Sequence, residues 1–332
     1  MSLRMLLATA ATLALAGTAI AADAIKPAVV YDKAGKHDKS FGQSVFEGAT
    51  KFQKDSGIKF ADFEPQNESQ MEQGLRNFAE KGYSPILAVG FAFTDALTKV
   101  AKDFPNTHFG IIDSVVDAPN VQSIVFKEQE GAYLVGILAA MASKTGKVGF
   151  VGGMDIPLIR RFACGYVGGV HAANAKDEVI QNMTGTTGDA WNDPVKGGEL
   201  AKAQIAAGAD VIYHAAGATG NGVLQAAADA KKLGIGTDAN QDYMHPGSVL
   251  TSNLKRVDVA AIDLFTEEKD GKFKPGIKVL GLAEGGVGWS LDEFNKALIT
   301  PEMQKAVETA EADIKTGKLK VHDFMEDQKC PY

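Results

Sequence analysis

The sequence predicts an α/β protein of two doubly wound units, each a mainly parallel sheet with helices on both faces. Short apolar runs typical of buried strands alternate with segments whose apolar residues recur at helical spacing. The alternation restarts in the second half of the chain without a strong internal sequence repeat. A chain of 332 residues is also longer than one small core requires, so two domains are expected.

The first unit is expected to contain five strands separated by amphipathic helices. The strands are predicted at Ala28–Tyr31, Lys59–Phe63, Pro85–Val89, His108–Ile112 and Val121–Phe126, and the helices at 44–56, 69–81 and 94–104. In the first helix Val45, Ala49 and Phe52 fall on one face, as a helix that covers a sheet requires.

The second unit repeats this order. Its strands are predicted at 147–151, 178–182, 210–214, 234–236 and 248–254, with a last strand at 277–282. Helices are predicted at 131–143, 193–207, 222–233, 257–266 and 300–316. Gly131–Ser143 is apolar on all sides, which indicates a buried helix.

Residues 1–21 are interpreted as a secretory signal peptide. Arg4 precedes the apolar run Met5–Ala16, and Ala19-Ile20-Ala21 has the small-residue pattern of a cleavage site. No cysteine lies near this site, so no lipid anchor is expected. No later apolar run is long enough to span a bilayer. We therefore expect an exported protein, periplasmic in a host with two membranes.

The net charge and the missing motifs argue against several classes of function, and the two cysteines raise the question of a disulfide. The net charge is −7 and basic residues do not cluster, which argues against nucleic acid as a partner. The two cysteines, Cys164 and Cys330, permit one disulfide in an oxidising compartment, and two unpaired thiols are the alternative. The six histidines show no metal-ligand spacing, and P-loop, nucleophile-elbow and zinc-protease motifs are missing. We expect no metal, no cofactor and no enzymatic activity.

Acidic residues and glycines recur where the predicted strands end, which is where open α/β sheets bind ligands. These residues are Asp32, Gly90-Phe91, Asp113, Gly152-Gly153, Gly217 and Asp238. Glycine lets a ligand approach the backbone, and a carboxylate accepts hydrogen bonds from hydroxyls. A helix cap could explain any one Asp, but the recurrence indicates a binding cleft. The Gly-rich segment 217–222 is interpreted as a tight turn lining that cleft rather than a phosphate loop.

Two aromatic residues lie on such loops, one in each unit. Phe41 ends the charged run YDKAGKHDKSF at a helix start, where Ser40 and Asp38 are candidates for the helix cap and for its dipole. Trp191 lies in the polar segment GDAWNDP before the next helix. Phe41 and Trp191 could clamp a planar ring between the units, although each could instead pack in a core.

The chain resembles the basic membrane protein family of ABC-transporter substrate-binding proteins, which includes bacterial purine nucleoside receptors. The matching stretches are VVYDKAGKHDKSFGQSVFEG, ILAVGFAFTDAL, FGIIDS, GAYLVGILAA, KVGFVGGMDIP, AAGATGNGVLQAA, GIGTDANQD, VLTSNLKRVDVA and GLAEGGVGWS. The resemblance implies a type I periplasmic binding protein with three hinge crossings. The implied N-terminal lobe is 22–128 plus about 253–282, and the C-terminal lobe is 129–252 plus about 283–332.

The resemblance also implies roles for single residues. Phe41 and Trp191 would stack on a base, and Asp113, Asp238 and Lys255 would contact a ribose. Asp32 and Asp38 would face the base or the pocket mouth. Phe91 and Gly217, at their strand ends, are further candidate ligand-binding residues. The chain departs from the family pattern at His37-Asp38, where paired acids are common, and at Gly42, where Asn is common. It also lacks the lipobox cysteine of many relatives.

These observations predict a monomeric periplasmic protein that closes on a purine nucleoside and delivers it to an inner-membrane ABC permease. A free purine base or a sugar is the alternative ligand. An exported nucleoside hydrolase is a further alternative, because a ribose ringed by Asp resembles such a site. The effector domain of a transcription regulator shares the fold, but the signal peptide and the missing helix-turn-helix argue against it.

Overall fold

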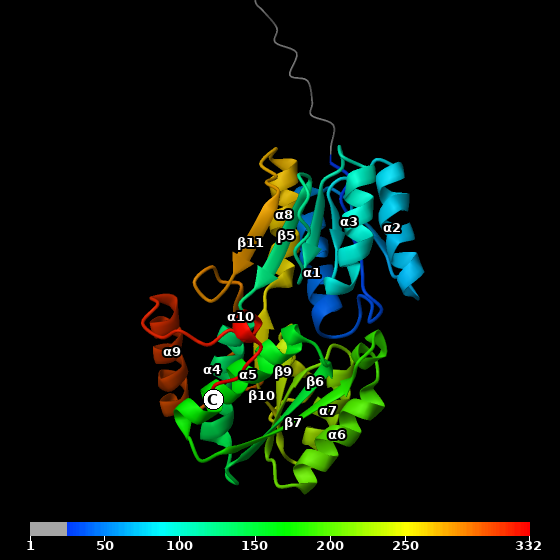
Figure 1. The fold of residues 1–332 in the computed structure, drawn as a ribbon. Helices are drawn as coiled ribbons and strands as arrows, with labels where there is room; N and C mark the ends of the chain where they lie inside the picture. Colours follow the sequence, from blue (N-terminus) through cyan, green and yellow to red (C-terminus); the bar gives the residue numbers. More distant parts are fainter. Residues whose placement is uncertain (1–24) are drawn as a thin grey trace, which may run out of the picture.

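The computed structural model describes residues 25–332, so the expected signal peptide, residues 1–21, lies outside the described part. Two α/β lobes lie one above the other in Figure 1. The part built on the six-stranded sheet β11-β5-β4-β3-β1-β2 is called the N-lobe, and the part built on the six-stranded sheet β12-β10-β9-β8-β6-β7 is called the C-lobe. The predicted fold of two doubly wound units is confirmed.

The N-lobe sheet is parallel throughout. Its strands are β1 (Ala28–Val30), β2 (Ala61–Phe63), β3 (Ile86–Ala88), β4 (Phe109–Ile112), β5 (Val121–Phe126) and β11 (Gly276–Leu280). Successive side chains of a strand point to opposite faces. Val29 therefore packs with α1 (Phe41–Ser56) and α8 (Val257–Lys269), while Ala28 and Val30 pack with α2 (Glu68–Glu80) and α3 (Thr94–Asp103).

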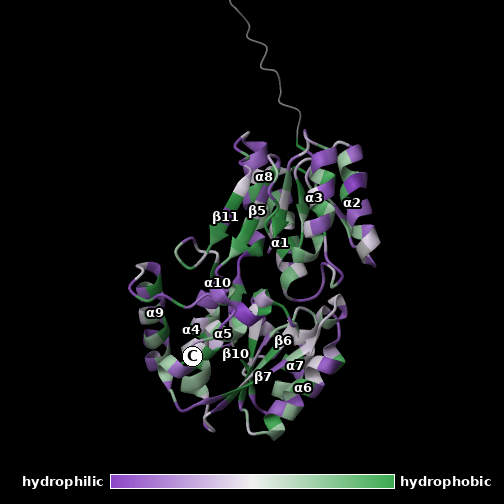
Figure 2. Ribbon diagram, viewed as in Figure 1, coloured by the Kyte–Doolittle hydropathy of each residue, from purple (hydrophilic) through white to green (hydrophobic). Residues whose placement is uncertain are grey.

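The C-lobe sheet is parallel except for its edge strand β12. Its strands are β6 (Lys147–Met154), β7 (Glu178–Gly185), β8 (Val211–Ala215), β9 (Leu233–Asp238), β10 (Val249–Lys255) and β12 (Val287–Trp289). Helices α4 (Glu128–Ala142), α5 (Pro157–Ala173) and α9 (Pro301–Lys315) pack together, and α6 (Pro194–Ala206) packs on α7 (Thr219–Asp229). Figure 2 shows hydrophobic strands inside both lobes and hydrophilic residues on the outer helices.

The chain crosses between the lobes three times. The crossings are at Lys127, between β5 and α4, at Arg256, between β10 and α8, and at 281–286, between β11 and β12. Backbone hydrogen bonds tie them together, from Lys127 N to the Leu280 carbonyl at 3.0 Å and from Arg256 N to the Gly286 carbonyl at 2.8 Å. The second crossing follows Lys255, slightly beyond the boundary expected near 253, because β10 continues to Lys255.

Helix α5 and strand β12 were not predicted. α5 contains Gly165, Gly168 and Gly169, and glycine is a poor helix former, so its pattern does not stand out in the sequence. The same glycines let α5 pack closely on α4, since a Cβ at Gly165 would overlap the backbone of Gln129 and one at Gly169 would overlap the Tyr133 carbonyl. Strand β12 is only three residues long and leaves a weak signal.

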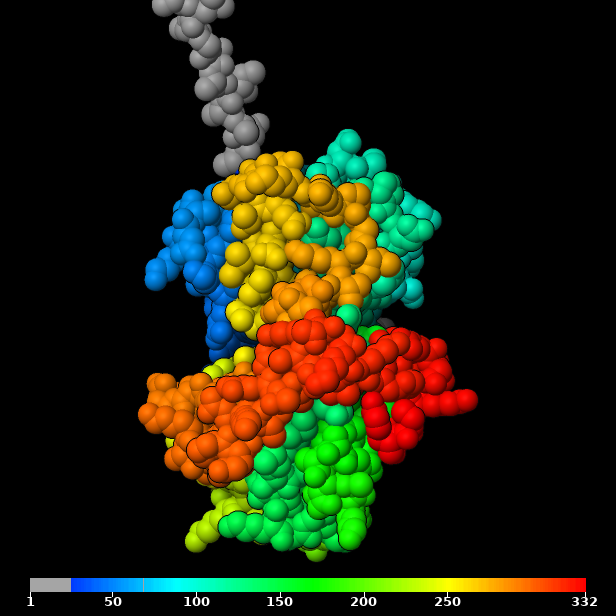
Figure 3. Space-filling model, turned by 90° about the vertical axis from the view of Figure 1, so that its left-hand side faces the viewer, coloured from blue at the N-terminus to red at the C-terminus, as the bar shows by residue number. Residues whose placement is uncertain are grey.

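The C-terminal segment lies over α5 (Figure 3). It includes the short helix α10 (Phe324–Asp327), and a disulfide joins Cys330 to Cys164 of α5 with their Cα atoms 5.5 Å apart. The ring of Tyr332 covers Gly168. Arg161 of α5 pairs with Asp323 of the C-terminal segment. Because Arg161 and Cys164 lie about one turn apart on α5, this segment is held along one side of the helix. Within residues 25–332, no helix has the length and apolar character needed to cross a bilayer.

Candidate ligand-binding site

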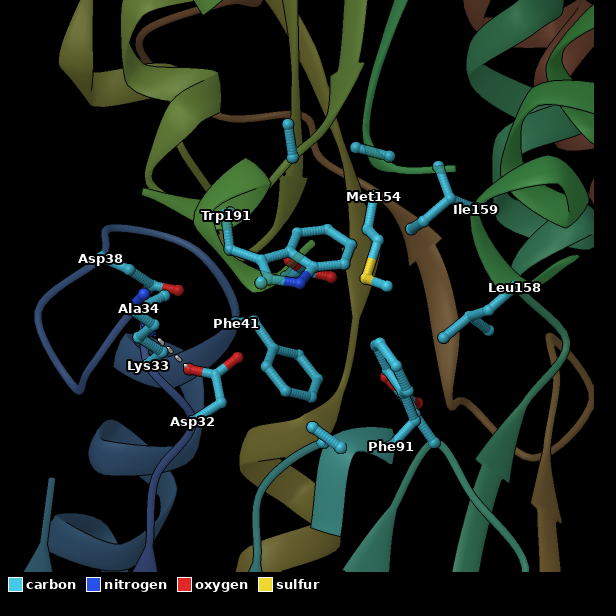
Figure 4. Close-up of a pocket in the computed structure, with 18 of the residues that line it drawn as sticks. Asp32, Lys33, Ala34, Asp38, Phe41, Phe91, Met154, Leu158, Ile159 and Trp191 are labelled. Carbon is cyan, nitrogen blue, oxygen red and sulfur yellow. Dashed lines mark hydrogen bonds between the residues drawn. The ribbon is translucent and has the colours of Figure 1, made fainter. Parts of the chain in front are cut away.

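A cavity of about 300 Å³ lies between the lobes, where the carboxyl ends of strands from both sheets meet. Figure 4 shows side chains from both lobes turned toward it. The structure brings all the predicted site residues to this one cavity: Asp32, Asp38, Phe41, Phe91, Asp113, Trp191, Gly217, Asp238 and Lys255. The volume lies at the lower end of the range of about 300–1,000 Å³ typical of small-molecule sites.

The apolar part of the cavity has walls from both lobes. Phe41 begins α1 and Phe91 begins the short helix η1 (Phe91–Phe93), whereas Trp191 ends η2 (Gly188–Trp191) and Met154 ends β6. Trp191 and Met154 lie across the cavity from Phe41 and Phe91 (Figure 4). Phe91 and Trp191 meet edge to face, with centroids 6.4 Å apart and an interplanar angle of 68°. Such a wall favours a flat apolar ring.

Glycines make room for the tryptophan. The indole ring of Trp191 lies against Gly153 at the end of β6, where a Cβ would overlap it. Gly217 has φ +55 and lies under the Trp191 carbonyl, in the turn between β8 and α7. In the same turn, the hydroxyl of Thr219 donates to the Ala190 carbonyl at 2.8 Å. The Gly-rich segment therefore acts as a tight turn lining the cavity, as predicted.

A buried lysine lies at another wall. Lys255 Nζ is 2.6 Å from Asp113 Oδ1 and 2.9 Å from Glu128 Oε1, and the Lys255 side chain is 3% exposed. The ammonium also lies 5.3 Å from the centroid of the Phe41 ring and 5.2 Å from that of Phe126. Burial alone would lower the pKa of Lys255, but Asp113, Glu128 and Asp238 raise it above its usual value, so the lysine is a cation.

Ion pairs continue from Lys255 away from the cavity. Glu128 Oε2 is 2.8 Å from Arg161 Nη1, and Arg161 also pairs with both oxygens of Asp323, at 2.8 and 3.0 Å. Lys255, Glu128, Arg161 and Asp323 are called the charge chain. Glu128 follows the first crossing directly, and Lys255 precedes the second. The charge chain therefore connects the cavity, the hinge and the C-terminal segment.

Two aspartates occupy matching strand ends. Asp113 follows β4 and Asp238 ends β9, and both have left-handed backbones, with φ values of 68° and 66°. Asp238 Oδ2 accepts a hydrogen bond of 2.6 Å from the Ser40 hydroxyl of the opposite lobe. Burial raises the pKa of Asp238 to about 7, against the lowering effects of Lys255 and Ser40. Burial also raises the pKa of Asp113, which Lys255 opposes.

The two aspartates of the first loop differ in what they contact. Asp32 accepts a backbone hydrogen bond from Ala34 N at 3.0 Å, and burial together with the nearby Asp38 raises the pKa of Asp32 to about 7. The carboxylate of Asp38 instead accepts the amides of Ser40, Gly42 and Gln43 at 2.8–3.0 Å. Asp38 therefore holds the start of α1, whereas the hydroxyl of Ser40, the other capping candidate, crosses to the C-lobe.

Several lining residues were not predicted. They are mainly apolar and include Met71, Met154, Leu158, Ile159, Phe162 and Thr237. Leu158, Ile159 and Phe162 belong to the first turns of α5, the helix missed in the sequence. Met154 directly follows Gly152-Gly153, and extending the strand-end pattern by one residue would have found it. Within residues 25–332, His, Cys, Asp and Glu side chains form no group of three suited to a metal ion.

Comparison with known proteins places this cavity in context. The family model for PnrA-like ABC transporter substrate-binding proteins matches residues 25–323. The chain is 35% identical over 320 residues to the ABC transporter nucleoside-binding protein BmpA of Lactococcus lactis subsp. cremoris, covering 90% of this chain and 89% of that protein. It is 35% identical over 317 residues to the CD4+ T-cell-stimulating antigen of Listeria monocytogenes, covering 89% of this chain and 87% of the antigen.

Solved structures of binding proteins have folds similar to that of this chain. A solute-binding protein of an ABC transporter system from Aeropyrum pernix superposes with a TM-score of 0.83 at 31% identity, covering 90% of this chain and 93% of that chain. A glucose-galactose binding protein from Geobacillus stearothermophilus superposes with a TM-score of 0.55 at 17% identity, covering 77% of this chain and 95% of the other. The second likeness concerns the fold alone.

Proposed function

The chain belongs to the family of PnrA-like ABC transporter substrate-binding proteins, and from that premise we propose that it binds a purine nucleoside between its lobes and delivers it to a membrane permease. The observation that carries the proposal is one cavity that combines facing aromatic side chains with buried carboxylates and a lysine. A nucleoside has the same two parts, a flat base and a sugar with hydroxyl groups. The relative from Lactococcus is itself named a nucleoside-binding protein.

In this proposal the base lies among Phe41, Phe91 and Trp191, and Asp32 faces its polar edge. The ribose hydroxyls donate to Asp113 and Asp238, while Lys255 donates to a ribose oxygen. Hydrogen bonds to ionised groups are stronger than neutral ones, and exclusion of water strengthens them further. The lobes move as units about the three crossings. The boundary expected near residue 253 lies after Lys255 instead. The protein works as a monomer and is not an enzyme.

We propose an exported, periplasmic location. Disulfides persist in oxidising compartments, and Cys164 and Cys330 form one here. Relatives from Pyrococcus are named lipoproteins, and the expected absence of a lipid anchor in this chain stays a prediction. Labelling of cells with a fatty-acid analogue, followed by fractionation, tests both points. Unlabelled protein in the periplasmic fraction is the expected result.

A thermal-shift screen tests the ligand class. The protein is refolded to remove carried ligand and is heated with adenosine, guanosine, inosine, the free bases, ribose or glucose. A ligand that binds only the folded state raises the melting temperature, and we expect nucleosides to do so and ribose not to. A rise with free bases alone would indicate a base importer, and a rise with a sugar alone would contradict the nucleoside proposal. Release of free base during the incubation would indicate a hydrolase instead.

The two tryptophans provide a matched pair of variants. Trp191 lines the cavity, whereas Trp289 lies on β12 and donates to Glu311 at 3.1 Å. Trp191→Ala is expected to weaken nucleoside binding by roughly 1–3 kcal/mol, the range measured for base–aromatic stacking. Trp289→Phe is expected to leave affinity unchanged and to retain the fluorescence change caused by the ligand. Unchanged affinity of Trp191→Ala would remove Trp191 from the site.

A further inference from the structure

Loop 38–40, which leads into α1 of the N-lobe, is held by four groups of the C-lobe. Asn221 Nδ2 donates to the Asp38 carbonyl at 3.0 Å, and Gln241 Nε2 donates to the Lys39 carbonyl at 3.0 Å. The Ser40 hydroxyl contacts Asp238 Oδ2 at 2.6 Å and the Thr237 carbonyl at 3.0 Å. We propose that these contacts form a latch that holds the cleft closed and so sets the affinity for ligand. This inference rests on the proposed function.

The C-lobe side of the latch is oriented before the cleft closes. Gln241 Oε1 accepts from the Thr237 amide at 2.8 Å and faces His214 Nε2 at 2.9 Å. Because the Thr237 amide can only donate, the side-chain oxygen must face it, and Nε2 must point toward the N-lobe. Burial lowers the pKa of His214 to about 4, so the ring is neutral and its Nε2 carries the hydrogen. All these partners belong to the C-lobe and persist when the lobes separate.

The N-lobe side is equally well ordered. The carboxylate of Asp38 accepts the amides of Ser40, Gly42 and Gln43, and this arrangement fixes loop 38–40 on α1. Lys39 has φ 68, a left-handed backbone that a lysine adopts only when its surroundings hold it there. In this conformation the carbonyls of Asp38 and Lys39 both meet donors of the C-lobe. The role of Asp38 is thus to shape the latch.

The latch lies outside the hinge and shares one proposed ligand contact, Asp238, with the cavity. Ser40, Asn221 and Gln241 do not line the cavity, and Asp238 is the one latch side chain that does. The bonded residues are 183 to 202 positions apart in the chain and lie outside the three crossing segments. These bonds exist only when the lobes meet. When binding requires the closed form, apparent affinity scales with the closed fraction, so the bonds of Asn221 and Gln241 can tune affinity without contacting the ligand.

Asn221→Asp is the sharpest test. The change keeps the shape of the side chain but places an oxygen against the Asp38 carbonyl, which removes the hydrogen bond and adds repulsion. Asn221 lies in the first turn of α7, where a negative charge favours the helix. The variant should therefore be at least as stable as the wild type and yet bind nucleoside roughly tenfold more weakly, through faster dissociation. Gln225→Glu, on the exposed side of α7, is the control and should bind as wild type.

Stopped-flow binding of adenosine, guanosine and inosine measures both rate constants, and small-angle scattering of the ligand-free protein measures closure. We expect Asn221→Asp and Ser40→Ala to raise the dissociation rate constant and Asn221→Asp to enlarge the radius of gyration. Wild-type dissociation in both variants, or a loss confined to association, would overturn the latch. If no nucleoside binds even the wild type, the proposed function fails, and the scattering comparison still decides on the latch. Equal radii for Asn221→Asp and wild type would then overturn it.

Discussion

Asp113 and Asp238 occupy the same place in the two lobes but have different surroundings. The strands that carry them, β4 and β9, hold the third position in the order of their sheets. Both residues have left-handed backbones, and both line the cavity. Asp113 is held by the ammonium of Lys255 at 2.6 Å, whereas Asp238 is held by the hydroxyl of Ser40 at 2.6 Å.

Lys255 and Ser40, the partners of the two aspartates, belong to different parts of the molecule. Lys255 directly precedes a hinge crossing and belongs to the charge chain, so the pair with Asp113 lies at the hinge. Ser40 belongs to the latch and meets Asp238 only in the closed form. The same residue at the same backbone position thus pairs with a cation beside the hinge in one lobe and with the hydroxyl of the latch in the other. Variants can separate these two roles.

Removal of the lysine should have the largest effect. Lys255→Met leaves Asp113 and Glu128 buried without their shared cation, and loss of one partner of a buried pair destabilises a protein by about 3–5 kcal/mol. Urea unfolding of the ligand-free protein measures the loss. Lys278→Met removes a lysine from Asp263 and Glu267 at the surface, and it should change stability by about 1 kcal/mol or less. Equal losses in the two variants would contradict an anchoring role for Lys255.

Removal of the disulfide should cause the next largest loss of stability. It joins residues 166 positions apart and holds the segment that carries Asp323, the last member of the charge chain. The double variant Cys164→Ser/Cys330→Ser should lose about 2–4 kcal/mol of stability, the usual contribution of a disulfide. A reducing agent should lower the urea midpoint of the wild type and leave that of the double variant unchanged. A response of the double variant to reductant would point to an effect outside this bond.

Much of the architecture was predictable from the sequence, because strands such as Val121–Phe126 combine apolar side chains with a turn signal beside them, here Pro119-Asn120. The gathering of Asp32 and Asp113 was also predictable, since parallel strands bring their carboxyl ends to one edge of a sheet, whereas Asp238 joins them from the other sheet only because the lobes face each other. Helix α5 was not predictable, because its glycines obscure the helical pattern and their purpose, close contact with α4, is visible only in three dimensions.

The partners of the site residues could not be predicted either. Glu128 begins α4 beside Gln129 and Glu130, and nothing in the local sequence connects it to Lys255 or to Arg161. The same holds for Gln241, whose partner Lys39 is 202 residues away. Local patterns predict where a side chain lies along a strand or helix, whereas such pairings depend on how the two lobes close.

Isosteric variants of the two aspartates compare them directly. Asp113→Asn and Asp238→Asn should each weaken nucleoside binding by about 1.5–3 kcal/mol, the contribution of a hydrogen bond to a charged group. Their effects on stability at pH 8 should differ in sign. Asp113→Asn deprives Lys255 of a partner and should lower the melting temperature, while Asp238→Asn removes a buried charge held by a hydroxyl and should raise it. Calorimetry of both variants without ligand measures the difference, and a shared sign would show that the two surroundings are equivalent.

The smallest expected effect concerns the pH dependence of stability, to which Asp238 contributes. The pKa of Asp238 in the folded protein is about 7, above the value near 4 expected for an unfolded chain. Between these values the folded form holds a proton that the unfolded chain has released, so stability falls as pH rises toward about 7, by at most about 1.4 kcal/mol per pH unit for one group. Asp32, whose pKa is also about 7, adds a similar slope.

Asp238→Asn should therefore reduce this slope, and Asp32→Asn/Asp238→Asn should reduce it further. Urea unfolding at several pH values between 5 and 8 measures the slope for each protein. A slope that Asp238→Asn leaves unchanged would mean that Asp238 is ionised throughout this range, as a carboxylate paired with a cation would be. In that case Asp238 would match Asp113 after all, and the Ser40 hydroxyl would hold a full negative charge in the closed cleft.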